Sequence, residues 1–257
     1  DDAVLSRLGR DHDGASAQAA VARAVAAFGS VSVDLIFGVA GERDRRITDD
    51  LDRLLDLGVA HISTYQLTIE PGTAFARAEA RGTRRAVGED RSAEEFETIS
   101  ERLSAAGFNH YEVSNFARPG HESQHNLAYW RGQDYVGVGP GAHGRLWTET
   151  GAGLVRVATE TALRPADYIA AVRAEGTAIT DRESLSAESA AEEYVMMGLR
   201  IDAGLSLSRL ADIRGQALQI EPALIRDGLL SHEGDRLRAT TAGRMVLDAL
   251  TRAILLP

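Results

Sequence analysis

The chain has 257 residues, 44% of them hydrophobic and 26% charged, which is typical of a globular protein with room for one domain or for a larger and a smaller one. Its formal net charge of −10 disfavours non-specific binding to nucleic acid or anionic lipid, because both need a basic surface. It contains no cysteine, which excludes disulfides, thiolate metal sites and an iron–sulfur cluster held by this chain's own residues.

The first 156 residues alternate predicted helices with predicted strands. Apolar side chains recur at helical spacing or every second residue, and Gly107 is a typical residue to end a helix. We expect helices at 14–28, 46–57 and 92–106, and strands at 31–37, 60–67, 109–114 and 135–138. This alternation indicates parallel βα units in an α/β fold. Because only about four strands are visible and a complete eightfold barrel takes ~250 residues, the chain is expected to begin partway through a barrel-like domain.

After about residue 156 the predicted elements change to helices at 165–176 and 186–201 and a short helix near 206–212. The last segment reads as helix, short strand, turn at 233–235, short strand and helix, which resembles a winged-helix module. Such modules often bind DNA, but many serve only in packing, and the acidic chain favours the second role. We therefore expect two domains, a partial βα barrel at 1–156 and a helical and winged-helix-like α+β domain at 157–257.

Residues 108–146 hold four of the seven histidines, with aromatic residues between them. Imidazole is a common metal ligand, and aromatic rings stack on flat ligands. The histidines are His110, His121, His125 and His143, and the aromatic residues include Tyr111, Tyr129, Trp130 and Tyr135. If HNLAYW is helical, His125 and Tyr129 share a face at spacing i, i+4. Two interpretations stay open: a structural histidine beside a core tryptophan, or a contact to iron or porphyrin.

Two charged residues precede this window. Alternation along VSVDLIF puts Val33, Leu35 and Phe37 on one face and Asp34 on the other, where it pairs with an arginine or accepts hydrogen bonds from a ligand hydroxyl. Arg10 follows a short predicted helix, where it complements the helix C-terminus or binds a ligand carboxylate. The run GVGPGAHG is weak evidence for a phosphate site, and it fits better a tight turn or a close approach to a ligand.

Four blocks make a family recognisable: VSVDLIFGVAG, HISTYQLTIEPGTAFA, HYEVSNFARPGHESQHNLAYWRG and DYVGVGPGAHGRL. In this order they resemble the radical S-adenosylmethionine proteins related to oxygen-independent coproporphyrinogen III oxidase, and more closely the HemW-type heme chaperone branch. The resemblance covers nearly the whole chain. It implies the C-terminal part of a partial (β/α)6 barrel, and a CxxxCxxC motif whose 4Fe-4S cluster is chelated by S-adenosylmethionine. That motif is absent from this chain, which as given should be inactive in radical chemistry.

The resemblance also assigns site residues. Arg10 would face the methionine carboxylate of S-adenosylmethionine and Asp34 its ribose hydroxyls, so both should point into one cavity at the C-terminal ends of the strands. The HNxxYW motif, implicated in heme binding, corresponds to His125, Asn126, Tyr129 and Trp130, with His125 as the expected contact to the heme iron. No residue is assigned a catalytic role.

Two functions follow from the resemblance. The first is a cytoplasmic heme chaperone, a porphyrin-related protein that binds heme and hands it to acceptor proteins, among them membrane-associated respiratory proteins, and that forms a homodimer. The second is a radical decarboxylase that converts the propionates of coproporphyrinogen III to vinyl groups. HNLAYW favours the first. A winged-helix regulator is a third interpretation. No apolar run approaches the ~20 residues that cross a bilayer, and no secretory signal pattern is seen.

The absence of cysteine generates a direct prediction for this polypeptide. Anaerobic reconstitution with iron and sulfide should give no stoichiometric cluster absorbance, because the chain offers no thiolate to hold iron. Visible spectroscopy with iron and sulfide analysis checks this outcome. A reproducible stoichiometric cluster would contradict it.

Overall fold

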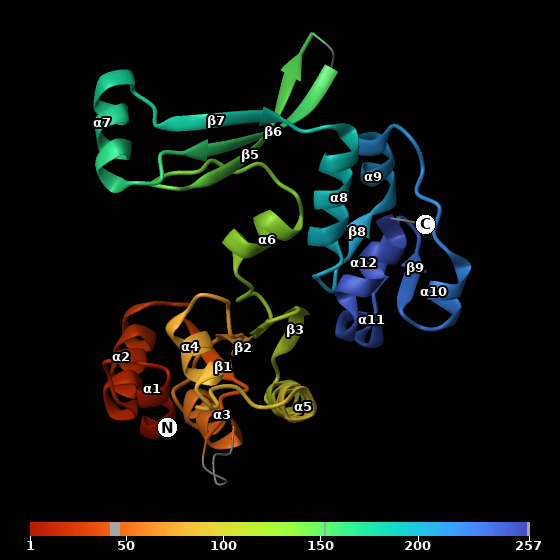
Figure 1. Cartoon of the computed structure of the whole chain (residues 1–257). Helices are drawn as coiled ribbons and strands as arrows, with labels where there is room; N and C mark the ends of the chain where they lie inside the picture. Colours follow the sequence, from red (N-terminus) through yellow and green to blue (C-terminus); the bar gives the residue numbers. More distant parts are fainter. Residues whose placement is uncertain (42–46, 152, 256–257) are drawn as a thin grey trace. The chain divides into compact units, whose positions relative to one another are not determined.

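The computed structural model describes residues 1–41, 47–151 and 153–255. The chain divides into two compact units, a first unit at Asp1–Glu122 and a second unit at Ser123–Pro257 (Figure 1). Both units combine helices and strands, as expected for an α/β protein. The boundary expected after residue 156 falls inside strand β6 (Gly153–Thr161), whereas the compact units divide between Glu122 and Ser123.

The first unit is built on one mixed four-stranded sheet. Its strands are β1 (Ser32–Phe37), β2 (His61–Gln66), β4 (Asn115–Ala117) and β3 (Asn109–Glu112), in that spatial order. β1 and β2 are parallel, as predicted, whereas β4 is antiparallel to both β2 and β3. The reason is the two-residue turn between β3 and β4, since a connection this short can join only antiparallel strands.

The helices of the first unit are α1 (Asp2–Arg7), α2 (Gly14–Ala27), α3 (Ile47–Asp56), α4 (Ala74–Ala80) and α5 (Glu89–Ala105). The apolar face of the sheet packs against α2, α3 and α5, and Leu51 of α3, Ile62 of β2 and Leu103 of α5 have no exposed surface. Val33, Leu35 and Phe37 join this cluster, so the predicted alternation along β1 is confirmed. The predicted start of α3 at residue 46 lies outside the described residues.

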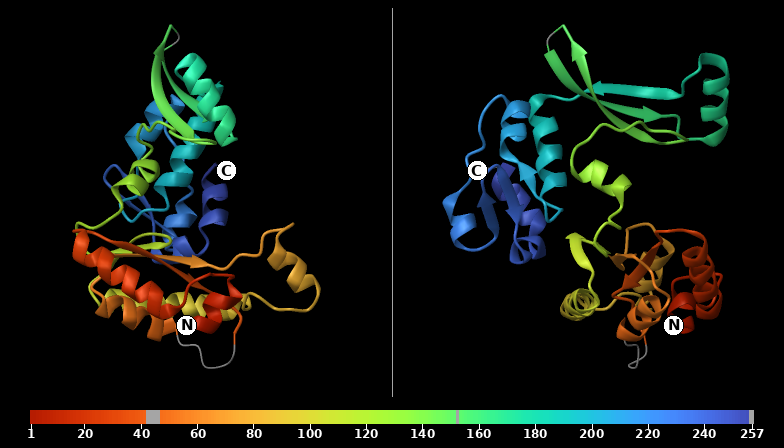
Figure 2. Two further views of the ribbon diagram at one scale, coloured as in Figure 1. Left: turned by 90° about the vertical axis from the view of Figure 1, so that its left-hand side faces the viewer. Right: turned by 180° about the vertical axis from the view of Figure 1, so that it is seen from behind.

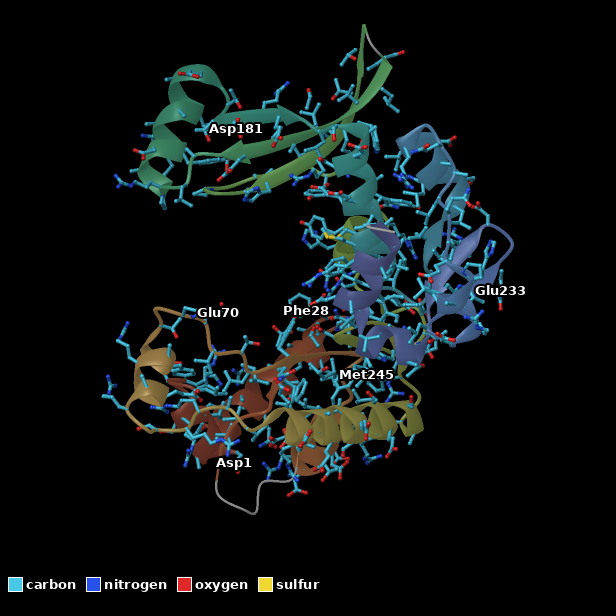
Figure 3. The ribbon with its side chains drawn as sticks, turned by 45° about the vertical axis from the view of Figure 1, so that its right-hand side comes forward. Asp1, Phe28, Glu70, Asp181, Glu233 and Met245 are labelled. Carbon is cyan, nitrogen blue, oxygen red and sulfur yellow. The ribbon has the colours of Figure 1, made fainter. Side chains whose placement is uncertain are left out.

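The second unit begins with helix α6 (Gln124–Trp130) and continues into an antiparallel sheet of β5 (His143–Thr150), β6 and β7 (Ile179–Ser184), in the order β5-β6-β7. Helix α7 (Pro165–Glu175) joins β6 to β7 at the end of the sheet away from the β5–β6 turn (Figure 2). All six residues of β7 are exposed, among them Asp181, labelled in Figure 3. The strand predicted at 135–138 is instead a single bridge between Tyr135 and Arg145.

A small three-stranded sheet, in the order β8-β10-β9, completes the second unit. Its elements are α8 (Ala187–Gly198), β8 (Leu205–Ser206), α9 (Leu207–Arg214), α10 (Pro222–Arg226), β9 (Leu230–Glu233), β10 (Arg236–Ala239), α11 (Thr241–Met245) and α12 (Leu247–Leu255). Leu199, Leu210 and Leu237 form its fully buried core. The predicted turn between β9 and β10 is confirmed, with Gly234 at φ +57°. Among the described helices, none is long and apolar enough to cross a membrane.

Candidate functional site

Helix α6 presents the HNLAYW segment. The side chain of Ser123 starts the helix by accepting a hydrogen bond from the Asn126 amide at 3.3 Å, which satisfies one of the free N–H groups at a helix N-terminus. Leu127 is buried and anchors the helix in the second unit. Gly132, at φ +60°, follows the last turn and ends it. The predicted helical spacing is present, so His125 and Tyr129 lie one turn apart on one face.

His125, Tyr129 and Tyr135 form a row of aromatic rings. The Tyr129 hydroxyl lies 3.0 Å from Nε2 of His125, and the two rings meet edge to face with centroids 4.7 Å apart. Tyr135 meets Tyr129 in the same way at 4.4 Å. Burial raises the pKa of Tyr135, so its phenol is neutral at neutral pH. Edge-to-face contacts at these distances are favourable and fix the ring positions.

This row opens onto a cavity of about 630 Å³ within the second unit, a volume in the usual range for small-molecule sites. The walls come from α6, the loop after it, β5, β6, α8 and α9. Besides His125, Tyr129, Trp130 and Tyr135, the polar and aromatic residues that line the cavity are His143, Arg145, Trp147, Arg156, Glu193, Tyr194 and Arg209. Asn126 is not among the described lining residues.

Three arginines and one glutamate line the cavity, which gives it a positive balance in an acidic chain. Arg145 donates to both carboxylate oxygens of Glu193, with its closest contact at 2.8 Å, and these hydrogen bonds raise the pKa of Arg145. Arg156 is almost fully buried and donates to Asp134 at 2.6 Å. Burial lowers its pKa, and the carboxylate opposes that effect. Arg209 donates to the main-chain carbonyl of Gly132 at 2.8 Å.

The glycine-rich loop forms one wall of the cavity and makes a close backbone turn. A Cβ on Gly137 would lie 2.7 Å from the carbonyl oxygen of His143, so a side chain does not fit there. Gly139 adopts φ +108°, and its carbonyl accepts a hydrogen bond from Thr161 of β6 at 2.6 Å. The tight turn expected of this run is therefore present. Val136 and Val138, on either side of Gly137, stay exposed and line the cavity with apolar surface.

Trp130 also borders the cavity and is held from outside it. The Arg200 guanidinium carbon lies 4.6 Å from the centre of its indole ring. The indole Nε1 is buried and has no hydrogen-bond partner among the described residues. Because a buried N–H without an acceptor is costly, this atom is a ready donor for a polar group of a ligand.

The four histidines of the window separate into two pairs. His125 and His143 both line the cavity of the second unit. His110 stacks on Phe116 in the first unit, with ring centroids 4.3 Å apart, and His121 contacts the Ser30 hydroxyl at 3.1 Å. The sequence pattern located the window but could not separate the pairs, because the two units divide inside it.

The first unit brings the two other candidate residues together. Arg10 and Asp34 both line a cavity of about 260 Å³. Both side chains are exposed and make no hydrogen bond or ion pair with another described residue, so the alternative of a structural ion pair for Asp34 has no support here. Asp34 occupies the third of the six positions of β1, whereas we expected the shared cavity at the C-terminal ends of the strands.

The polar face of the same sheet holds a buried histidine that the sequence analysis missed. His61 is 2% exposed, with its ring nitrogens 2.7 Å from the Ser32 hydroxyl and 2.8 Å from the Tyr111 hydroxyl. Burial lowers the pKa of His61, and the nearby carboxylates, Asp34 first, oppose that shift. In the sequence, the one indication of its position was the alternation of side chains along β2. In the structure His61 pairs with Ser32 across the sheet.

Comparison with known proteins identifies the fold and the family. Residues 185–246 match the family model of the HemN C-terminal domain. The structure of coproporphyrinogen III oxidase (HemN) from Escherichia coli, a radical SAM enzyme, superposes with a TM-score of 0.71 at 16% identity, over 100% of this chain and 62% of that one. At this identity the similarity shows a shared α/β fold.

The sequence relatives are closer. The heme chaperone HemW of Mycobacterium tuberculosis is 39% identical over 98% of this chain, and that of Bacillus subtilis is 30% identical over 99% of this chain and 67% of its own length. A mitochondrial radical S-adenosyl methionine domain-containing protein of Mus musculus is 36% identical. The chain belongs to the HemW family of radical S-adenosylmethionine proteins. It spans 62% of the length of the mycobacterial relative and 60% of the mouse relative.

The buried histidine of the first unit generates a pH prediction. Its pKa should lie below the ordinary 6.5, because burial penalises the imidazolium. The unfolded chain then binds the proton more readily, so the stability that this neutral histidine contributes is present above pH 6.5 and is lost as the pH falls below it. An NMR titration of the His61 ring measures the pKa directly.

A His61→Gln variant serves as the control, because glutamine keeps hydrogen-bonding groups but does not titrate. Urea unfolding followed by circular dichroism should lose stability less steeply in this variant as the pH falls from about 7 to 5, by up to about 1.4 kcal/mol per pH unit. A His61 pKa at or above 6.5, or equal slopes in both proteins, would contradict the assignment.

Proposed function

We propose that this chain binds heme in the cavity of the second unit and carries it to acceptor proteins. The observation that carries the proposal is the cavity itself, because three of the four HNxxYW positions, His125, Tyr129 and Trp130, open onto it. Its position beside this segment, its size and its mixture of aromatic and basic side chains agree with one ligand class, a flat anionic metalloporphyrin.

Each part of the cavity fits a part of heme. The imidazole of His125 supplies an axial ligand for iron, and His143 offers a second imidazole in the same cavity. The rings of Tyr129 and Tyr135, with Val136 and the exposed Val138, provide apolar and aromatic surface for the porphyrin. The arginine-rich wall favours the negative propionates. Asn126, which does not line the cavity, would support α6 and not touch the porphyrin.

The proposal agrees with the family. Relatives that share 30–39% of this chain's residues are named heme chaperone HemW. We infer the same cargo for this chain, with heme-acceptor proteins as partners. Respiratory proteins at a membrane, a homodimer and a cytoplasmic location are the further expectations that come from the resemblance.

S-adenosylmethionine has a partial site in the first unit. Arg10 would hold its carboxylate and Asp34 its ribose hydroxyls, and both side chains line one cavity without a competing partner among the described residues. The 4Fe-4S cluster does not fit the residues present, because the chain has no cysteine. We therefore derive no radical step for this polypeptide. In this interpretation the first unit is the C-terminal part of a (β/α)6 barrel, and the last segment of the second unit is winged-helix-like.

A second candidate function is the oxidative decarboxylation of coproporphyrinogen III. The shared fold with the Escherichia coli oxidase favours it. The closer sequence relatives are chaperones, and the cavity holds an imidazole suited to iron, which an iron-free porphyrinogen does not need. Heme carriage is therefore the better-supported function.

Heme titration tests the proposal. Hemin added to the purified chain should shift the Soret band, and His125→Ala should weaken binding by about tenfold or more, equivalent to about 1.4 kcal/mol, because the axial bond is lost. His121→Ala is the matched control, since this histidine belongs to the same sequence window but lies in the first unit. Identical spectra and affinities for His125→Ala and the unmodified chain would overturn the assignment of His125.

A further inference from the structure

The atom of His125 that should bind iron is already engaged. Nε2 is the imidazole nitrogen farther from the backbone, so it is the one that a bulky porphyrin can reach. In this structure the Tyr129 hydroxyl lies 3.0 Å from that nitrogen. If the imidazole proton is on Nδ1, the Tyr129 O–H donates to the Nε2 lone pair that iron requires. If the proton is on Nε2, that nitrogen has no free lone pair. In either tautomer Nε2 therefore has no lone pair available to bind iron.

We propose that Tyr129 is a latch on His125: its hydroxyl holds Nε2 in the cargo-free chain, and heme iron must displace it to bind. The inference rests on the proposed heme function and adds a regulatory residue to that site. It assigns a competing role to the Tyr129 hydroxyl, separate from the aromatic surface that the Tyr129 ring offers the porphyrin.

The surroundings of Tyr129 favour the arrangement in which its hydroxyl is hydrogen-bonded to Nε2 of His125. The spacing i, i+4 on α6 places the two side chains in contact without distortion. On its other side Tyr129 meets Tyr135 edge to face at 4.4 Å. Tyr135 is itself fixed, because its backbone exchanges two hydrogen bonds with Arg145 of β5, at 2.8 and 2.9 Å. The Tyr129 ring is thus supported in the position from which its hydroxyl reaches His125.

The strength of such a latch suits a carrier. One hydrogen bond between neutral groups at an exposed position changes an affinity by about three- to tenfold. An effect of this size is enough to slow the binding of heme but not enough to prevent it. It also helps release, because the Tyr129 hydroxyl forms its hydrogen bond to Nε2 again when iron leaves. In a closed pocket, a histidine whose Nε2 had no competing hydrogen bond would bind heme more tightly and release it more slowly.

The test compares Tyr129→Phe with Tyr65→Phe, which removes a tyrosine hydroxyl from an exposed position of β2 in the first unit and leaves the cavity of the second unit intact. Hemin and iron-free protoporphyrin IX are the probes, with affinity and association rate measured by Soret absorbance and stopped flow. Tyr129→Phe should bind hemin about three- to tenfold more tightly and associate faster, and its affinity for protoporphyrin IX should stay unchanged, because that ligand has no iron to compete for the nitrogen. Tyr65→Phe should change neither the affinity nor the association rate of either porphyrin.

A double-mutant cycle separates this inference from the function on which it rests. In a His125→Ala background the effect of Tyr129→Phe on hemin should disappear, because there is no nitrogen to release. If Tyr129→Phe weakens hemin binding, Tyr129 is a ligand or a support and the latch is wrong. Equal tightening of both porphyrins, or no change, also overturns it. If His125→Ala leaves hemin binding intact, the proposed heme site itself fails, which is a different result.

Discussion

The position at which α6 begins determines which of its side chains face the cavity of the second unit. Ser123 caps the helix through the amide of Asn126, and from that start the spacing of the helix sets His125 and Tyr129 on one face and Leu127 in the interior. A start one residue later would rotate these side chains by about 100°, since a helix has about 3.6 residues per turn. The imidazole would then leave the cavity. The capping serine thus helps to fix the position of the histidine.

Charge gives the site its second constraint. The chain is acidic overall, yet Arg145, Arg156 and Arg209 line one cavity, and Glu193 is the one carboxylate among its described lining residues. Each guanidinium is held by a carboxylate or a main-chain carbonyl, so the groups are fixed before a ligand arrives. Because the donors are already oriented, little ordering is required of them when an anionic ligand enters. The apolar loop and the basic wall suit the ligand that we propose, which is flat, largely hydrophobic and negatively charged at one edge.

Much of the fold was predictable where apolar periodicity is strong. The alternation in β1 and the β9–β10 turn follow directly from the sequence, whereas a helix in HNLAYW entered only as the condition for placing His125 and Tyr129 on one face. The sheet of β5, β6 and β7 was not predicted, because β7 is exposed along its whole length and has no buried face to produce a pattern. The antiparallel β3–β4 pair was missed because its strands are only four and three residues long.

The candidate site was predictable only in part, for a similar reason. HNLAYW is contiguous, so one helix carries its signal. Arg145, Glu193 and Arg209 reach the same cavity from β5, α8 and α9, and no local pattern connects positions so far apart. The window of four histidines looked like one cluster, yet His110 packs against Phe116 in a different compact unit. Imidazole serves equally well as a core ring and as a ligand, and only the tertiary structure separates the two roles.

We propose that one histidine, released from one tyrosine, binds the iron of heme in the cavity of the second unit. An experimental structure of the chain loaded with heme tests it most directly. We expect that iron is bonded to Nε2 of His125, that the Tyr129 hydroxyl has moved away from that nitrogen, and that the propionates lie beside the arginine-rich wall. Iron ligated by another residue, heme bound outside the cavity, or a His125–Tyr129 hydrogen bond that persists in the loaded protein would contradict it.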